Sequence, residues 1–241
     1  MILSGHQPCY LPGLQFFNKV MHSDAFMYVP HCQYQAKSWH SHNYICTSKL
    51  IVPTHSTLGN SLFEVTIDYS ETWQRKHLRA IELAYSKTPF FKQYYEELSL
   101  LLNNKYGSLA ELNIALTDWL AEELNCGPYD KCFYTQTPDL AQYADPVDML
   151  IAMCKSVGCD EYLSNQGAKV YITPAAEARM GEAGIRHRWL KFTDPDYGQG
   201  SVDINGERLV DVNGGRFSGL DILFTRGPGA AKIIKEAGSI A

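Results

Sequence analysis

Apolar runs separated by amphipathic segments predict strands that alternate with helices along the chain. Short apolar runs at 1–5, 25–30, 131–136, 160–164 and 186–192 have the length and composition of strands. Several of the segments between them repeat apolar residues every three or four positions, as the buried side of a helix does. Because parallel strands need crossover connections, this order predicts an α/β fold with a mostly parallel sheet and crossover helices.

Two regions depart from this alternation. Short runs at 44–46, 49–52 and 63–67 have strand character and predict a β-rich extension of the amino-terminal part. Residues 72–125 carry three successive helical patterns, each preceded by a residue suited to begin a helix, and they predict a helical insertion.

Length and composition fit one ordinary globular domain over residues 1–241. The chain is 45% apolar and 20% charged, and we expect a tail at 201–241 in which the glycine-rich segment 202–229 forms loop and hairpin before a terminal helix. A formal net charge of −5 without a long Lys/Arg run argues against nucleic-acid binding. No apolar stretch approaches the roughly eighteen residues of a membrane span, and no secretory pattern is visible. With seven scattered cysteines, which fit reduced thiols, the sequence predicts a cytoplasmic protein.

The first candidate site is the polar loop after the first predicted strand. His6, Gln7 and Tyr10 lie between Ile2–Leu3 and a helix that starts after Pro12–Gly13. In an open parallel sheet such a loop lies at the carboxyl end of a strand, where α/β folds bind ligands. His6 is a candidate general base because the imidazole pKa is ordinarily near neutrality. Alternatively, it bonds a backbone carbonyl and holds the turn.

Two alternatives involve the thiols. Cys9 lies close to His6 and is a candidate nucleophile with a lowered pKa, although Cys–His pairs usually come from distant segments. The segment 31–46 holds five ligands that zinc accepts, but it lacks CxxC or HExxH spacing and also fits a polar β-rich rim. Those five residues are His31, Cys32, His40, His42 and Cys46. The sequence therefore predicts no metal site.

Two further segments have the character of ligand-binding sites. Arg75-Lys76-His77 begins a predicted helix and can hold an anionic donor, or can simply be a solvated face. Ser164-Asn165-Gln166-Gly167 follows a strand but has no nucleotide-binding fingerprint. Since junctions at the carboxyl ends of parallel strands share one sheet edge, we expect one concave pocket. The residues predicted to line it together are His6, Gln7, Tyr10, Lys76 and Ser164.

Collinear motifs over nearly the whole chain resemble the WbqC-like protein family. The family pattern runs His-Gln-Pro-x-Tyr-x-Pro, Ser-Asp, Gln-Tyr, Ser-Trp-x-x-x-Asn, Arg-Lys-His, Pro-Phe-Phe and Tyr-Leu-Ser-x-x-Gly-Ala. The chain matches it in HQPCYLPGLQFFNKVMHSDAFMYV, CQYQAKSWHSHN, WQRKHLRAIELAYSKTPFF and YLSNQGAKVY. It departs at Cys9, where the family usually has Asn, and at Ser41-His42-Asn43, where the family reads Asn-Arg-Asn. The missing arginine removes a side chain suited to clamping a phosphate or carboxylate.

The resemblance implies an acyl or aminoacyl (glycyl-type) transferase that acts on an amino sugar or similar small amine in surface polysaccharide or O-antigen biosynthesis. It implies no bound cofactor, but an acyl-carrier protein or an activated aminoacyl donor as partner. The candidate catalytic residues are His6 and Tyr10, which belong to the family pattern, and Cys9, which does not. The candidate substrate-binding residues are Gln7, Gln33, Trp39, Asn43, Lys76, His77, Ser164, Gly167 and Tyr171.

Two other functions stay open. The same pocket also fits a non-catalytic carbohydrate- or nucleotide-binding partner of a biosynthetic complex. A histidine-bearing loop after the first strand also fits an ATP-dependent carboxylate–amine ligase, although the second His of a His-x-Gly-His signature is missing.

Overall fold

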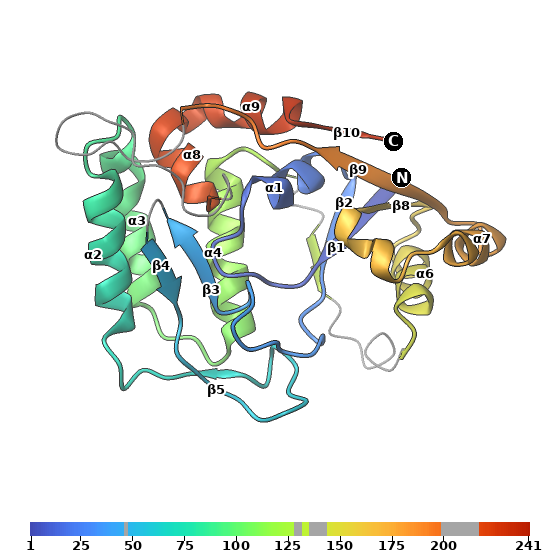
Figure 1. The fold of residues 1–241 in the computed structure, drawn as a ribbon, viewed down its shortest axis with the longest axis horizontal. Coiled ribbons are helices and arrows are strands. Elements are labelled where there is room, and N and C mark those ends of the chain that lie inside the picture. Colours follow the sequence, from blue (N-terminus) through green and yellow to red (C-terminus); the bar gives the residue numbers. More distant parts are fainter. Residues whose placement is uncertain (46–47, 128–131, 135–143, 199–216) are drawn as a thin grey trace.

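The structure is a computed structural model that describes residues 1–45, 48–127, 132–134, 144–198 and 217–241. Its centre is a six-stranded sheet with the strand order β10-β9-β8-β1-β2-β7 (Figure 1). All neighbouring strands are parallel except β10 and β9, which are antiparallel. The predicted α/β class is therefore confirmed, and all five predicted strands belong to this sheet. The strands are β1 (Ile2–His6), β2 (Ala25–Tyr28), β7 (Cys132–Tyr134), β8 (Glu161–Ser164), β9 (Arg186–Phe192) and β10 (Gly238–Ile240).

The direction in which the chain adds strands reverses between β1 and β8. From β1 the chain passes through α1 (Leu14–Met21) to β2, on the side of β7. From β8 it passes through η2 (Gln166–Val170) and α7 (Pro174–Glu182) to β9, on the other side. The helix α6 (Pro146–Ser156) precedes β8. Because the connections leave β1 and β8 in opposite directions, they leave a crevice at the carboxyl ends of these two strands, which is where open α/β sheets bind ligands.

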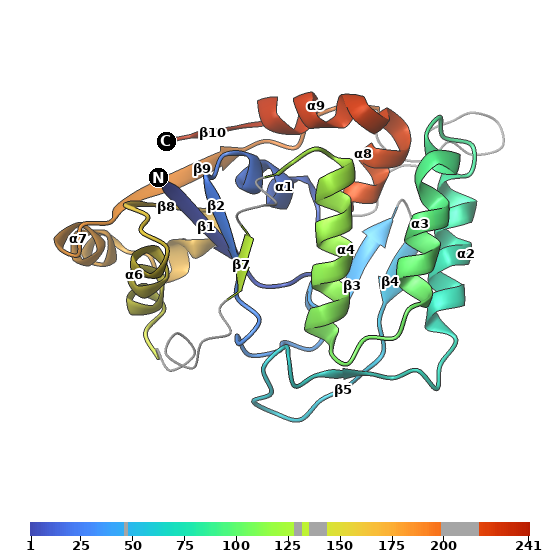
Figure 2. The same ribbon diagram turned by 180° about the vertical axis from the view of Figure 1, so that it is seen from behind.

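The two faces of the sheet carry different helices (Figure 2). Phe17 of α1 and Phe26 belong to the larger core, whereas Leu3 packs with Met153 of α6 in a second core that α7 also joins. Alternation along β1 explains this division, since successive side chains of a strand point to opposite faces. His6, three residues after Leu3, therefore points to the α1 face.

The predicted helical insertion at 72–125 is confirmed as three helices. Their apolar side chains enclose the larger core. Ser108 begins the third helix, because its hydroxyl oxygen accepts a hydrogen bond from the N–H of Glu111. Within the described residues, no helix is both long and apolar enough to cross a membrane. The three helices are α2 (Trp73–Tyr85), α3 (Phe91–Asn103) and α4 (Leu109–Glu123).

Two small antiparallel pairs form the predicted β-rich extension. Within the described residues, the predicted runs at 44–46 and 49–52 pair with each other over 44–45 and 48–49, and the pairing extends to His42 and Ile51. The prediction of a strand at 63–67 is wrong over its first three residues. The Glu64 carboxylate accepts hydrogen bonds from the N–H and the hydroxyl of Ser61, which turns the chain there. The pairs are β3 (His42–Ile45) with β4 (Ser48–Ile51), and β5 (Thr54–His55) with β6 (Thr66–Ile67).

The carboxyl-terminal tail is more helical than its glycine content predicts. The prediction of loop and hairpin is wrong over 219–229, and residues 201–216 lie outside the described ranges. The hydroxyl of Ser218 accepts a hydrogen bond from the N–H of Leu220 and begins a buried helix. The predicted terminal helix forms, and β10 then extends the edge of the sheet. The elements of the tail are α8 (Gly219–Arg226), η3 (Gly227–Gly229), α9 (Ala230–Glu236) and β10.

The contact between β1 and α6 requires a glycine. A Cβ added at Gly5 would lie 2.8 Å from Cε of Met153, which is fully buried. We expect Gly5→Ala to cost about 1–3 kcal/mol of unfolding free energy through overpacking. In a Met153→Ala background the same change should cost at least about 1 kcal/mol less, because the opposing methyl is gone. Urea unfolding of the two single variants and the double variant measures this coupling, and strictly additive effects would contradict it.

Candidate functional site

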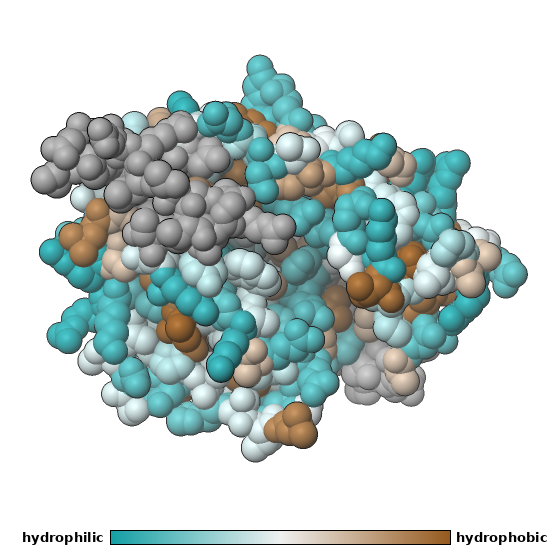
Figure 3. All heavy atoms as spheres, in the orientation of Figure 1, coloured by the Kyte–Doolittle hydropathy of each residue, from teal (hydrophilic) through white to brown (hydrophobic). Residues whose placement is uncertain are grey.

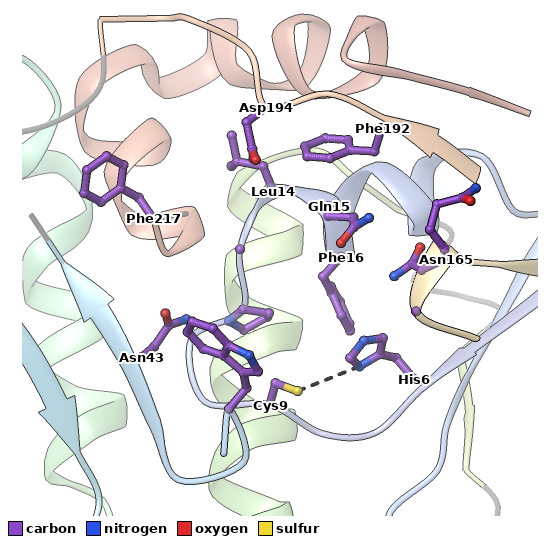
Figure 4. A pocket seen from close by; sticks show the side chains of 15 residues that line it. His6, Cys9, Leu14, Gln15, Phe16, Asn43, Asn165, Phe192, Asp194 and Phe217 are labelled. Atoms are coloured by element: carbon purple, nitrogen blue, oxygen red, sulfur yellow. Dashed lines mark hydrogen bonds between the residues drawn. The ribbon is translucent and has the colours of Figure 1, made fainter. Parts of the chain in front are cut away.

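A pocket of about 470 Å³ lies at the carboxyl ends of β1 and β8, where the strand order reverses. It opens on the face of the molecule shown in Figure 3, which is largely hydrophilic. The β1–α1 loop, the first turn of α1, the β8–η2 junction and the segment after β9 contribute its walls (Figure 4). The lining residues are His6, Cys9, Pro12, Gly13, Leu14, Gln15, Phe16, Trp39, Asn43, Asn165, Gln166, Gly167, Phe192, Asp194 and Phe217.

His6 is held in one tautomer at the end of β1. Its Nδ1 lies 2.7 Å from the carbonyl oxygen of Gln7, and because a carbonyl only accepts, Nδ1 carries the ring hydrogen. Burial, together with the nearby charge of Lys19, lowers the pKa of His6 to about 3, so the ring is neutral. Its Nε2 is therefore an unprotonated acceptor, and no described residue hydrogen-bonds to it. The ring of Phe16 packs edge-on against the imidazole and orients it.

Cys9 lies in the same wall but lacks an activating base. Its Sγ lies 3.4 Å from the carbonyl oxygen of Gln7 and 3.8 Å from Nδ1 of His6. Since that nitrogen already carries a hydrogen, it cannot take the proton of the thiol. Burial raises the pKa of Cys9 to about 12, which keeps the group a thiol at neutral pH. The geometry thus favours His6 as a base over Cys9 as a nucleophile.

The amino end of α1 also borders the pocket. The helix begins after Gly13, and no side chain caps it. The N–H of Phe16 donates to the carbonyl of Gly13 at 3.1 Å, whereas the N–H of Gln15 has no acceptor among the described residues. A helix amino end carries partial positive charge and free N–H groups. This end can therefore stabilise a negatively charged oxygen in the pocket.

Amide side chains from two elements face the space above His6. Gln15 projects from α1 and Asn165 from the β8–η2 junction (Figure 4). Gln166 is fixed because its Nε2 donates to the carbonyl of Leu190 at 2.9 Å, which leaves its Oε1 available. The Oδ1 of Asn165 is buried and has no hydrogen-bond partner within the residues that the structure describes. Amides both donate and accept hydrogen bonds, as hydroxyl-bearing ligands require.

A buried asparagine of α4 holds the start of the β1–α1 loop. The Nδ2 of Asn113 donates to the carbonyls of Pro8, at 3.2 Å, and His40, at 2.7 Å. The Nδ1 of His40 accepts from the N–H of Gln35, so its Nε2 carries the hydrogen and donates to Oε1 of Gln7 at 2.7 Å. Gln7 therefore belongs to the network that holds the loop and is not a lining residue.

A second asparagine, Asn43 of β3, holds the other end of the loop. Its Nδ2 donates to the carbonyls of Tyr10 and Leu11. Leu11 has a φ of +46°, a left-handed conformation that costs a non-glycine residue about 1–2 kcal/mol. Two buried hydrogen bonds, each contributing about 0.5–1.5 kcal/mol, are enough to offset this cost. Asn43 lines the pocket as predicted, but its amide nitrogen is occupied by the loop.

Tyr10 and His77 meet in the core and do not line the pocket. The N–H of Ile51 donates to Nε2 of His77 at 3.0 Å, so Nδ1 carries the hydrogen and donates to the Tyr10 hydroxyl at 2.8 Å. Both side chains are buried. Burial lowers the pKa of His77 to about 4 and raises the pKa of Tyr10. The pair connects the loop to β4 and α2.

Of the five residues predicted to line one pocket together, His6 lines it, whereas Gln7, Tyr10, Lys76 and Ser164 do not, so the predicted grouping is wrong. Ser164 follows Leu163, which is in register with Ser4 on the α1 face, so alternation turns Ser164 toward α6 and α7. Lys76 lies on the outer side of α2, with its ammonium 3.3 Å from the Glu71 carboxylate. On α2 the neighbouring His77 points into the core, so Lys76 points outward, because adjacent residues lie on different sides of a helix.

The remaining predicted substrate-binding residues divide between pocket and surface. Trp39 and Gly167 line the pocket, whereas Gln33 and Tyr171 do not. Gln33 is exposed and forms an isolated bridge with Ser61, and Tyr171 follows η2 at the surface. In the described part of the chain, no three His, Cys, Asp or Glu side chains gather in a way that could hold a metal ion. Cys46, from the alternative zinc set, lies outside that part.

Asn165 and Gln166 follow β8 and line the pocket, and both lie in the segment 164–167 that the sequence predicts to have ligand-binding character. Phe192 and Asp194, which end or follow β9, are lining residues that were not predicted. Gln15 lies in the first turn of the helix after β1. The signal that identifies them is position alone, because the carboxyl ends of parallel strands share one edge of the sheet.

The buried His77 makes stability depend on pH. Its pKa is about 4 in the folded protein, below the ordinary value of 6.5, so its contribution to stability is complete above pH 6.5 and is lost as the pH falls toward 4. We expect His77→Gln to reduce the slope of unfolding free energy between pH 6.5 and 4.5 by about 1.4 kcal/mol per pH unit. Tyr10→Phe, which removes the hydroxyl but no histidine, should retain the slope. Chemical unfolding at several pH values measures both, and equal slopes in His77→Gln and the parent chain would refute the assignment.

Comparison with known proteins assigns the chain to a family. No curated protein and no solved structure shows a significant match to it. The sequence profile of the WbqC-like protein family matches residues 7–233, a range that includes every pocket-lining residue except His6. The chain therefore belongs to the WbqC-like protein family.

Proposed function

We propose that the protein transfers an acyl or aminoacyl group to the amine of an amino sugar or similar small amine. The observation that carries this proposal is the neutral His6, whose unprotonated Nε2 lies at a pocket beside the amino end of a helix. Acyl transfer to an amine needs a proton acceptor and a group that stabilises an oxyanion. Both are present on opposite sides of the β1–α1 loop.

The chemical step uses these two features in order. The amine nitrogen attacks the carbonyl carbon of the donor, a C–N bond forms, and Nε2 of His6 takes the amine proton. The carbonyl oxygen becomes an oxyanion, which the N–H of Gln15 and the positive end of α1 stabilise. When the bond to the leaving group breaks, the imidazolium returns the proton to that group. The oxyanion beside the ring favours its charged form, which offsets the low pKa of the empty pocket.

The remaining lining residues suit a sugar acceptor. Phe192 and Phe217 supply aromatic surface, against which the C–H face of a sugar ring packs. The amides of Asn165 and Gln166 supply donors and acceptors for hydroxyl groups.

The proposal extends to the donor and the setting. The donor is an acyl-carrier thioester or another activated aminoacyl group, so the protein itself needs no bound cofactor. The pathway is surface polysaccharide or O-antigen biosynthesis, and the reaction takes place in the cytoplasm. These assignments are supported by membership of the family and by the chemistry of the pocket.

A carbohydrate-binding role without catalysis is the second candidate. The amide- and aromatic-lined wall favours it, because such a surface binds sugars whether or not a reaction follows. The two functions differ in what they require of His6: catalysis needs its Nε2, whereas recognition of the sugar needs the amides and aromatic rings.

Substitution of His6 and Cys9 tests the proposed chemistry. We expect His6→Ala to lower turnover by about two to four orders of magnitude, because it removes the base. Cys9→Ala should keep most activity, since this thiol is not activated. The measurement is product formation by mass spectrometry from amino sugars and acyl-carrier thioesters. A stable acyl adduct on Cys9 would establish a covalent path instead, and full activity in both variants would refute His6 as the base. Sugar binding without product formation by the parent chain would favour the carbohydrate-binding role.

The pH dependence provides a separate check on His6. Because its pKa in the free protein is about 3, the ring should stay neutral from pH 8 down to about pH 4. Activity that falls with pH in that range should therefore follow protonation of the acceptor amine and shift when the acceptor is changed. NMR titration of the His6 ring protons measures its pKa directly. A midpoint near 6.5 would show that burial and the charge of Lys19 do not lower the pKa of His6.

A further inference from the structure

A row of aromatic side chains extends from the pocket along the outer face of the β3–β4 hairpin, where Trp39 is exposed, Tyr44 is half-buried and His42 is buried. Trp39 precedes β3, and its ring centroid lies 5.9 Å from those of both His42 and Tyr44. Lys49 of β4 is in register with Tyr44, and its ammonium lies 5.6 Å from the centroid of that ring. We refer to Trp39, His42, Tyr44 and Lys49 as the aromatic face. The helices α2–α4 cover the opposite side of the hairpin (Figures 1 and 2).

The aromatic face is continuous with the pocket. Trp39 belongs to both, since it lines the pocket and keeps 42% of its surface exposed. The carbonyl of Tyr44 accepts a hydrogen bond from the N–H of Ser218, and Ser218 forms a bridge with Gly13 at the start of α1. The face therefore adjoins the amino end of α1. A ligand that enters the pocket and continues outward passes over this face.

The aromatic face combines the flat ring of Trp39 with the positive charge of Lys49. Lys49 is exposed, and its ammonium has no carboxylate partner among the described residues. Burial and the charge of Lys49 lower the pKa of His42, so the histidine is a neutral ring. A large, half-exposed Trp ring offers stacking area for a planar group, and the ammonium complements a nearby anion. A planar heterocycle with attached phosphate is the ligand class that combines these two properties.

We propose that the aromatic face binds the nucleoside phosphate part of a nucleotide-linked substrate whose reacting part occupies the pocket. This inference rests on the proposed function and deepens it by naming the substrate class. The base stacks on Trp39, and the phosphates lie between Lys49 and the amino end of α1. The nucleoside phosphate can belong to the acceptor, as a nucleotide-linked amino sugar, or to the acyl donor, as an adenylate or coenzyme A.

Titration calorimetry of the full chain with UDP and with ADP tests the binding site. We expect Trp39→Ala to weaken binding of the nucleotide about tenfold or more, because it removes the stacking surface. Trp39→Phe should retain most of the affinity, and Lys49→Met should weaken it about two- to fivefold, less at high salt. Lys105→Met is the matched control, since its ammonium also lies over a tyrosine ring, Tyr69, at 5.8 Å but in the helical insertion. It should bind like the parent chain.

Two further measurements separate this inference from the chemistry. His6→Ala should bind UDP or ADP as the parent chain does, even where its turnover is lost, so failure of catalysis and failure of nucleotide binding are distinguishable. Competition of UDP with the acceptor, or of ADP with the donor, in turnover assays identifies which substrate carries the nucleotide. Absence of binding by either nucleotide up to 10 mM, on the order of the weakest specific affinities, would overturn the proposal. Binding that is unchanged in both Trp39→Ala and Lys49→Met would also overturn it.

Discussion

The clamp that two buried asparagines place on the β1–α1 loop is the constraint on which the site depends. Asn113 and Asn43 reach the loop from α4 and β3, and between them they hold the backbone carbonyls of Pro8, Tyr10 and Leu11. Without these bonds three buried carbonyls would lack partners, at about 1–3 kcal/mol each. The loop in turn fixes Gln7, whose carbonyl sets the tautomer of His6. The helical insertion thus contributes to the site through the loop, although none of its residues lines the pocket.

The reversal of strand order supplies the space that the clamped loop borders. At the carboxyl ends of β1 and β8 no connection in the described part of the chain covers the sheet, because α1 and α7 lead away in opposite directions. The loop, the start of α1 and the β8–η2 junction then form the walls. The bridge between Ser218 and Gly13 places the carboxyl-terminal segment that begins α8 next to the start of α1. Sequence segments more than 150 residues apart therefore meet at one edge of one sheet.

The sequence predicts the sheet well because strand length and apolar character are local properties. It also identifies the correct edge of the sheet, since position at a strand end follows from the order of elements. Which residues at that edge face the pocket is not local. Gln7 and Tyr10 belong to the same motif as His6, but their partners, His40 and His77, come from distant segments and draw them into a supporting network. The face on which Ser164 lies can be predicted only from the register of β8 with β1, because a shift of one residue moves every side chain of a strand to the other face.

The histidines at the site and in the loop network are uncharged because they are buried. The loop network is made of neutral groups, since burial lowers the pKa of His6, His40 and His77 below their ordinary values. A charged imidazole in these positions would require a compensating anion, and each of these rings instead hydrogen-bonds a neutral group. His6 differs from the other two because only one of its nitrogens is used: Nδ1 bonds the loop, and Nε2 is left for a ligand. The fold therefore keeps all three histidines neutral, and among the described residues it leaves one unpaired ring nitrogen of the three, Nε2 of His6, at the pocket.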